Sequence, residues 1–289
     1  MVITSASNEQ IKNIIQLKKK AKVRKQTGCF VVEGIKMFAE IPKEDFVSAY
    51  ASETFVTEHE ELCSGFNAHI VSDSVYKKIS DTVTPQGILA IVKQKETTVD
   101  EIISDRNRRA LKDDCNKDRT IMGRDCKKDQ RMPGRQFANI DDKSCIIVLE
   151  RLQDPGNLGT IIRTGEGAGI SGIIMSRDCV DIYSPKVIRS TMGSIFRVPF
   201  AVTDDLPLAV QKIKEAGITT YAAHLKGNDL SSEKLAKDCA FLIGNESKGL
   251  SDEIASLADK LIKIPMEGQV ESLNASVAAS ILMYVHKMM

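Results

Sequence analysis

The chain has 289 residues, of which 42% are hydrophobic and 27% are charged. This length suggests about two domains, and this composition is typical of a soluble globular protein. The 40 Lys and Arg residues against 39 Asp and Glu residues leave a formal net charge of +1, which excludes a uniformly basic nucleic-acid binder but not a local basic patch.

The sequence carries no signal for a membrane or a secretory pathway. No stretch reaches the roughly 18 apolar residues of a membrane span, and the first residues, MVITSASNEQ, lack the apolar core of a secretory signal. The seven cysteines are scattered without a CxxC pair, and the four histidines show neither a triad nor metal-ligand spacing. We therefore expect a cytoplasmic protein with reduced thiols, no membrane contact and no metal.

The first segment with a clear pattern predicts a helix over residues 8–20. Ile11, Ile14 and Leu17 recur near helical spacing, whereas the following stretch is rich in Lys and Arg and contains no acid. Two interpretations stay open for these charges, a solvated helix face or a patch that follows RNA phosphates. The basic side chains are Lys12, Lys18, Lys19, Lys20, Lys22, Arg24 and Lys25.

The next segments predict a small α/β domain that ends near residue 95. A strand is expected at 29–33, a helix at 34–39, and further strands at 46–50, 68–72 and 88–92. Residues 104–135 differ in kind, because they hold 11 Lys or Arg and six Asp with few apolar residues. We expect a charged linker or insertion over 96–142, with an RNA-contacting arm as the alternative.

From residue 143 onward, short apolar runs alternate with helical patterns. The run SCIIVLE, residues 144–150, indicates a buried strand because its apolar residues are continuous. This alternation predicts a mainly parallel sheet with helices on both faces. Strands are expected at 172–176, 219–225, 239–244 and 261–266, and helices at 157–167, 185–192, 206–216, 251–258 and 272–286.

Two glycine motifs resemble nucleotide-binding signatures without their context. Residues 167–172 match G-x-G-x-x-G, but a helix is predicted before them and a strand after them, which is the reverse of the dinucleotide fingerprint. Residues 244–249 resemble a phosphate loop but lack the Lys-Ser/Thr pair after the second glycine. A nucleotide-dependent oxidoreductase is therefore disfavoured.

Polar residues are concentrated in three regions that follow predicted strands. These regions are 149–169, 184–199, and 241–250 together with 264–285. In open α/β sheets, ligands bind beyond the carboxyl ends of the strands, where such loops meet. Turns and helix caps would explain single residues here, but not the concentration of Asn, Arg, Glu and Ser in the same loops.

In these loops the sequence resembles the SpoU class of RNA ribose 2′-O-methyltransferases, which is related to TrmH. The resemblance covers roughly 145–287 with all three family motifs in order, and it extends more weakly over 3–95 to an L30e-like RNA-binding domain. The motifs are Asn157 with Arg163; Arg189-Ser190-Thr191-Met192-Gly193; and Gly244-Asn245-Glu246, Ile264-Pro265-Met266 and Ser272-Leu273-Asn274-Ala275-Ser276-Val277-Ala278.

This resemblance implies a domain organisation. Residues 1–95 would be an L30e-like RNA substrate-binding domain, and 143–289 a methyltransferase domain folded as an α/β trefoil knot. Family members form homodimers through the C-terminal region, so a homodimer is expected. The last predicted helix is apolar nearly all round, which is typical of a helix buried on every side.

The resemblance also implies the reaction, which is S-adenosylmethionine-dependent methyl transfer to a ribose 2′-hydroxyl in structured RNA. The expected substrate is 23S ribosomal RNA, and the alternatives are a transfer-RNA methyltransferase or a non-catalytic RNA-binding relative. No metal is required for this chemistry. The cofactor would be held by Gly244, Asn245, Ile264, Met266, Leu273 and Asn274, largely through backbone groups, with a glycine at 244 so that the backbone can approach the ligand.

By the same resemblance Arg163 is the family's proposed base. Because a guanidinium stays protonated in proteins, we expect Arg163 instead to clamp a substrate phosphate and to stabilise the developing alkoxide. Asn157, Glu246, Ser272 and Asn274 would orient Arg163 or the ribose. Arg189 of the second motif is expected among the RNA-binding residues, together with the basic side chains of residues 12–25.

Overall fold

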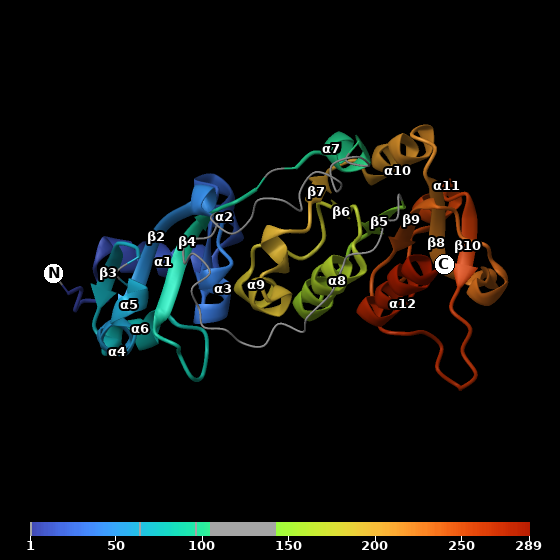
Figure 1. The fold of residues 1–289 in the computed structure, drawn as a ribbon. Helices are drawn as coiled ribbons and strands as arrows, with labels where there is room; N and C mark the ends of the chain where they lie inside the picture. The colour runs from blue at the N-terminus through green and yellow to red at the C-terminus, as the bar shows by residue number, and fades with distance from the viewer. Residues whose placement is uncertain (1, 64, 96, 105–142) are drawn as a thin grey trace. The chain divides into compact units, whose positions relative to one another are not determined.

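The computed structural model describes residues 2–63, 65–95, 97–104 and 143–289 (Figure 1). These residues form two compact units. Among the described residues, the first unit holds the chain up to Lys95 together with 181–196, and the second unit holds 97–104, 143–180 and 197–289.

The first unit is built on a four-stranded sheet with the strand order β1-β4-β2-β3. Strands β2 and β3 are parallel, whereas β4 runs antiparallel to both β1 and β2. The predicted small N-terminal α/β domain is confirmed. Its elements are α1 (Glu9–Lys19), α2 (Ala21–Thr27), β1 (Cys29–Glu33), α3 (Ile35–Ala39), η1 (Lys43–Asp45), β2 (Phe46–Ser52), α4 (Glu53–Glu58), α5 (Glu60–Cys63), β3 (Ala68–Val71), α6 (Asp73–Ile79) and β4 (Ile88–Lys93).

The helix predicted over residues 8–20 corresponds to α1, and the basic segment continues into a second helix, α2, that was not predicted. Ile11, Ile14 and Leu17 of α1 are buried in a core cluster with residues of β1, β4 and α6, as their spacing predicts. Lys20 lies between the helices with extended backbone angles, and Gly28 ends α2 in the left-handed conformation.

The first unit also contains α9 (Pro185–Thr191) and η4 (Ser194–Phe196). The ring of Phe30 in β1 lies 4.6 Å from that of Tyr183, measured between centroids, and the Arg24 guanidinium is paired with the Asp181 carboxylate. These contacts are the reason that 181–196 group with the N-terminal residues, although the motif resemblance runs through them without a break.

The second unit is a six-stranded, wholly parallel sheet with the order β10-β8-β9-β5-β6-β7. The predicted α/β class with a mainly parallel sheet is confirmed. The elements are α7 (Val99–Ser104), β5 (Ser144–Leu149), α8 (Pro155–Ala168), β6 (Gly172–Ser176), β7 (Phe200–Thr203), α10 (Leu206–Glu215), β8 (Thr219–Asp229), η5 (Leu230–Ser232), β9 (Asp238–Ile243), α11 (Asp252–Leu257), β10 (Lys260–Lys263) and α12 (Ala275–Met288).

Helices cover both faces of this sheet. Residues of α7, α10 and α11 share one core cluster with Ile146, Val148 and Leu242, which are alternate residues of β5 and β9. Successive side chains of a strand point to opposite faces, so Cys145 and Ile147 of β5 face the other side of the sheet. Helix α12 packs on this side, against β5, β9 and α8. Both faces are buried, which explains the continuous apolar runs in the sequence.

Several details of the second unit differ from the sequence predictions. Strand β7 has no counterpart among them, because its four residues are too few for a period to be visible. The strand expected at 261–266 ends at Lys263, so Ile264, Pro265 and Met266 belong to the loop that follows. Helix α7 lies inside the segment 96–142 that was expected to be a linker, and its Ile102 is 1% exposed.

The prediction that the last helix is buried on every side is wrong for the single chain. Ala279, Leu282 and Met283 of α12 are buried, but Val277 is 47% exposed and Tyr284 is 39% exposed. The charged segment 104–135 lies outside the described residues except for Ser104. Within the described ranges, no helix is long and apolar enough to cross a membrane.

Candidate functional site

A chain of hydrogen bonds joins three of the predicted site residues. The Asn157 Nδ2 donates to Glu246 Oε1 at 3.1 Å, and the Asn274 Nδ2 donates to Asn157 Oδ1 at 2.9 Å. These side chains come from α8, from the loop after β9 and from the residue before α12, which are far apart in the sequence. The carboxyl ends of the parallel strands β5 and β9 bring the first two of these loops together.

Helix caps fix two of these loops. Asp154 caps α8 by accepting from the Asn157 N–H at 2.8 Å, and Pro155 follows in the first turn of the helix. Asn274 caps α12, where its Oδ1 accepts from the N–H groups of Ser276 and Val277. The Asn274 amide therefore holds the helix start with its oxygen and Asn157 with its nitrogen.

The Glu246 carboxylate accepts four hydrogen bonds. They come from the N–H groups of Gln153 and Asp154 and from the side-chain amides of Asn157 and Asn245. Burial alone would raise the pKa of Glu246, but these donors outweigh it and lower the pKa below the ordinary value of a glutamate. Glu246 is therefore an ionised anchor for the loop between β5 and α8.

The loop after β9 closes on itself directly beyond the strand. Asn245 and Gly249 exchange two backbone hydrogen bonds, and the Asn245 Nδ2 donates to the Arg151 carbonyl at 2.9 Å. A Cβ at Gly244 would lie 2.0 Å from the carbonyl carbon of Gly249. The structure thus gives a reason for glycine at 244 that the sequence interpretation missed, which is the close return of the loop backbone.

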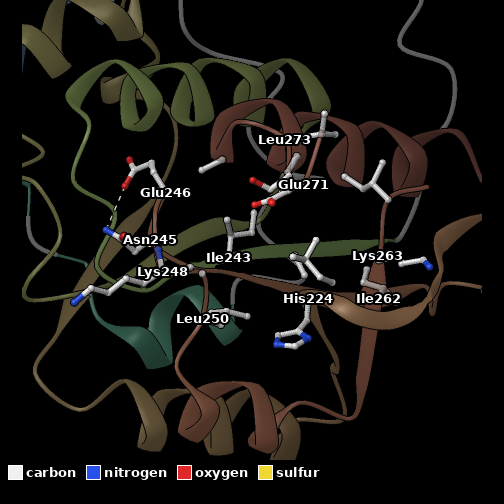
Figure 2. A pocket seen from close by; sticks show the side chains of 18 of the residues that line it. His224, Ile243, Asn245, Glu246, Lys248, Leu250, Ile262, Lys263, Glu271 and Leu273 are labelled. Atoms are coloured by element: carbon white, nitrogen blue, oxygen red, sulfur yellow. Dashed lines mark hydrogen bonds between the residues drawn. The ribbon is translucent and has the colours of Figure 1, made fainter. Parts of the chain in front are cut away.

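A pocket of about 460 Å³ lies beside this loop, in the second unit (Figure 2). Five of the six predicted cofactor residues line it: Gly244, Asn245, Ile264, Met266 and Leu273. Glu246 and Ser272 also line it, whereas Asn274 lies outside the lining. Apolar side chains, including Ile243, Leu250 and Leu282, form much of the remaining wall.

One wall of the pocket was not predicted from the sequence. It is formed by residues 223–226 of β8, among them His224, whose ring Figure 2 shows at the side of the pocket opposite Leu273. The sequence offered a signal, because residues 223–225 are the carboxyl end of the strand expected at 219–225 in a parallel sheet. The strand expected at 219–225 stops short of this wall's last residue and carries none of the predicted site residues.

Arg163 and Ser272 do not join the hydrogen-bonded cluster. Arg163 is exposed on α8 and makes no hydrogen bond or ion pair with any described residue. Asn157, six residues earlier on the same helix, is 8% exposed and lies on a different face. The structure therefore leaves the Arg163 guanidinium available to a ligand.

Two of the predicted RNA-binding side chains do not fit that role. Lys18 is 8% exposed and is paired with Glu33 at 2.9 Å and Asp81 at 3.1 Å. Arg24 is 5% exposed and donates to Asp181 and to the backbone carbonyls of α1. Both side chains therefore form ion pairs within the first unit. The basic side chains of this segment that are exposed are Lys12, Lys19, Lys20, Lys22 and Lys25.

Arg189 belongs to the first unit and is half-buried in α9. Its Nη1 lies 3.9 Å from the Asp81 carboxylate, which also pairs with Lys18. Arg189 therefore has a partner within the protein and retains part of its surface for another one.

Comparisons with known families match both parts of the chain. Residues 144–284 match the SpoU rRNA Methylase family, and residues 8–90 match the MRM3-like substrate binding domain. One match ends before residues 105–142, which the structure does not describe, and the other begins after them.

Individual relatives match the chain over nearly its whole length. It is 28% identical to the 23S rRNA (guanosine(2553)-2′-O)-methyltransferase RlmP of Bacillus subtilis, over 98% of this chain and 97% of the relative. An uncharacterized tRNA/rRNA methyltransferase of Synechocystis is 29% identical over 98% of this chain and 92% of its own length. Among solved structures, the AdoMet-bound rRNA methyltransferase of Sinorhizobium meliloti is 27% identical with a TM-score of 0.73, over 100% of this chain and 97% of its own.

Proposed function

Residues 144–284 of this chain are a SpoU methylase domain and residues 8–90 are an MRM3-like substrate-binding domain, and from that premise we propose that the protein methylates a ribose 2′-hydroxyl of RNA. The cofactor is S-adenosylmethionine. The observation that carries the proposal is the conjunction of the pocket around Gly244, Met266 and Leu273 with the adjoining cluster of Asn157, Glu246 and Asn274.

The pocket fits S-adenosylmethionine in size and chemistry. Its volume of about 460 Å³ lies in the usual range for a small-molecule site, roughly 300–1,000 Å³. Its apolar wall suits an adenine ring, while backbone groups of the loops at 244–250 and 264–273 offer donors and acceptors to the polar ends of the molecule. When bound, the cofactor supplies an activated methyl group on a sulfonium centre.

In the proposed reaction, the chain's own residues bind and orient the RNA. Arg163 holds a phosphate of the substrate and stabilises charge on the attacking oxygen, because its guanidinium is exposed on α8, the helix that also carries Asn157, and has no protein partner among the described residues. Glu246 does not remove a proton, since both its oxygens already accept from N–H groups. It fixes Asn157 and the start of α8, while Ser272 and Asn274 orient the ribose from the opposite loop.

The proposed substrate is 23S ribosomal RNA. Support comes from the full-length similarity to a 23S ribosomal RNA enzyme and from the substrate-binding domain match at 8–90. Exposed Lys12, Lys19, Lys20, Lys22 and Lys25 would bind phosphates of this RNA. A cytoplasmic location is part of this proposal, because ribosomal RNA is met there.

Assembly is a further part of the proposal. The exposed side chains of Val277, Tyr284 and Met288 lie at helical spacing along α12, with the partly buried Ile281 between them. A solitary apolar stripe on a helix marks a contact surface, so we expect α12 to pair with α12 of a second copy. The trefoil knot expected for the family would include residues 264–274, the loop that precedes α12.

Two binding and transfer assays test the proposal. Calorimetry without added metal is expected to show S-adenosylmethionine binding and no NADH binding; the reverse preference would overturn the proposed cofactor. Methyl transfer to a 23S ribosomal RNA transcript is then compared with transfer to a transfer-RNA pool. Preference for transfer RNA would favour the alternative substrate, and cofactor binding without any transfer would favour the non-catalytic relative.

A further inference from the structure

We propose that the second unit contains a binding site for a thiophilic metal ion, formed by Cys145, Cys239 and His286. The ligand atoms of these three residues all lie within 4.8 Å of one another. The site is separate from the methyl-transfer pocket, whose lining includes none of them. Nothing in the motif analysis indicated it, because the three residues are far apart in the sequence.

The sheet register brings the two thiols together. Cys145 in β5 and Cys239 in β9 are direct partners in adjacent parallel strands, so their side chains leave the same face of the sheet. His286, in the last turn of α12, packs over this face. Cys145, Cys239 and His286 are 5%, 0% and 5% exposed, so their side chains are shielded from bulk water.

The orientation of His286 matches that of a metal ligand. Its Nε2 lies 2.9 Å from the Lys237 carbonyl oxygen, which can only accept a hydrogen bond, so this nitrogen carries the proton. The other ring nitrogen, Nδ1, then carries the lone pair that interacts with the Cys145 thiol, and it would coordinate the ion once that thiol has lost its proton. A histidine that ligates a metal nearly always donates its second ring N–H to a carbonyl or carboxylate in this manner.

The donor set selects the kind of ion. Two thiolates and an imidazole are soft ligands, which suit Zn²⁺ and not Mg²⁺ or Ca²⁺. Binding of Zn²⁺ would release the two thiol protons, so that two thiolates balance the charge of the ion.

The position of the site indicates a structural role. An ion there would tie the C-terminal turn of α12 to β5 and β9, and the other end of α12 begins at Asn274 of the hydrogen-bonded cluster. The metal would therefore stabilise the helix that carries part of the methyl-transfer site without taking part in the reaction. This inference does not depend on the proposed RNA substrate.

Zinc titration of the full-length protein tests the site. Cys115 and Cys126 are first replaced by Ser, so that these two thiols do not contribute. The chelator-treated protein is titrated with Zn²⁺ against a chromophoric chelator, and with Co²⁺ for the near-ultraviolet charge-transfer band of cobalt thiolates. We expect one equivalent of Zn²⁺ per chain, a thiolate band with Co²⁺ and a rise of several degrees in Tm.

Matched variants assign the binding to the three residues. Cys239→Ala and, separately, His286→Gln are expected to lose the stoichiometric binding and the rise in Tm, whereas Cys179→Ser, elsewhere in the same unit, is expected to keep both. S-adenosylmethionine affinity reports that each variant is folded. Absence of Zn²⁺ binding in the parent protein, or equal binding by folded Cys239→Ala and His286→Gln, would overturn the proposal.

Discussion

At the scale of single residues, the proposed site separates a fixed part from a free part. Asn157, Glu246 and Asn274 are held by one another and by helix starts, while the Arg163 guanidinium has no partner among the described residues. Fixed side chains set geometry, and an unpaired exposed cation meets the phosphate of a substrate. Substitutions at the two kinds of position should therefore have different consequences.

Arg163→Ala should keep cofactor affinity and lose most methyl transfer, because the residue lies outside the pocket lining. Arg163→Lys keeps the charge but loses the planar fork, so a bidentate phosphate clamp fails while charge stabilisation survives in part. Single-turnover methylation at saturating RNA measures both variants, with calorimetry for the cofactor. A rate close to wild type in Arg163→Ala would remove Arg163 from the mechanism.

Glu246→Gln should destabilise the unit, because one carboxylate oxygen becomes an N–H donor that faces other N–H donors. Because Glu246 is only partly buried, water can satisfy part of the new donor, so the free energy of unfolding should fall by about 0.5–1 kcal/mol. Urea denaturation measures this loss. Glu215→Gln, an exposed residue of α10, is the control and should change little.

The lowered pKa of Glu246 adds a dependence on pH. A depressed folded-state pKa contributes stability above the unfolded value, about pH 4.3 for glutamate, and this contribution is lost as the pH falls through the lower folded value. The difference in Tm between wild type and Glu246→Gln should therefore shrink below about pH 4. A difference that stays constant from pH 7 down to pH 3 would show that the charge of Glu246 is unimportant.

The three residues of this cluster were predicted as site residues together with Arg163 and Ser272, but the sequence did not indicate which of the five would be connected. Asn157, Glu246 and Asn274 could be found because they sit in loops after strands and in family motifs. Their hydrogen bonds depend on the tertiary arrangement of three loops, which no local pattern contains. The same reason explains the error for Lys18 and Arg24, whose acidic partners Glu33, Asp81 and Asp181 are remote in the sequence.

At the scale of elements, helices α1 and α2 combine a structural charge with a functional surface. Lys18 points into the unit, where its side chain and that of Glu33 are 5% and 6% exposed. Lys19, Lys20 and Lys22 are exposed on the adjoining turns. The basic residues of one segment thus have two roles: the buried ones stabilise the unit, and the exposed ones can bind RNA.

The two roles predict two outcomes. Replacing Lys19, Lys20 and Lys22 with Gln should lower the slope of log affinity against log salt by roughly 0.7–0.9 for each RNA phosphate that the protein no longer neutralises, at unchanged Tm. Filter binding over a range of salt measures the slope. Gln at Lys36, Lys43 and Lys77, exposed elsewhere in the first unit, should leave it unchanged. Equal slopes for both triple variants would show that these lysines form a solvated surface and do not bind RNA phosphates.

In the Lys18→Met variant, in contrast, the first unit should be less stable, because the buried Glu33 carboxylate loses its ion-pair partner. Breaking one side of a buried pair costs about 3–5 kcal/mol. Urea denaturation of Lys18→Met measures this loss. A stability equal to wild type would contradict the structural role assigned to Lys18.

Element boundaries were predicted well where a period or a cap was present. The strands at 29–33 and 172–176 agree with β1 and β6 because their apolar runs end at glycines, acids or serines. Strand β7 and helix α2 were missed, because both are short and are decided by packing and not by a local signal. The family resemblance implied the site residues where periodicity alone would have left only polar loops.

At the scale of the whole molecule, the exposed stripe on α12 predicts self-association. Val277→Asp should shift the protein towards the monomer, because it places a charge in the proposed interface without harming the first turn of the helix. Leu208→Asp is a closely matched control: both residues are 47% exposed, and both follow a capping residue by three positions. Sedimentation across a concentration series measures the outcome, and an unaltered dimer in Val277→Asp, or a monomeric wild type, would contradict the assembly.

The position at which the methyl group is placed is the most direct test of the proposed reaction. A 2′-O-methyl group blocks alkaline cleavage of the adjoining phosphodiester, because that cleavage requires a free 2′-hydroxyl. The full-length protein is incubated with 23S ribosomal RNA and S-adenosylmethionine labelled in the methyl group, and the RNA is then hydrolysed with alkali. Label is expected in alkali-resistant dinucleotides. Label in mononucleotides, which marks a methylated base, would contradict methylation of a ribose 2′-hydroxyl.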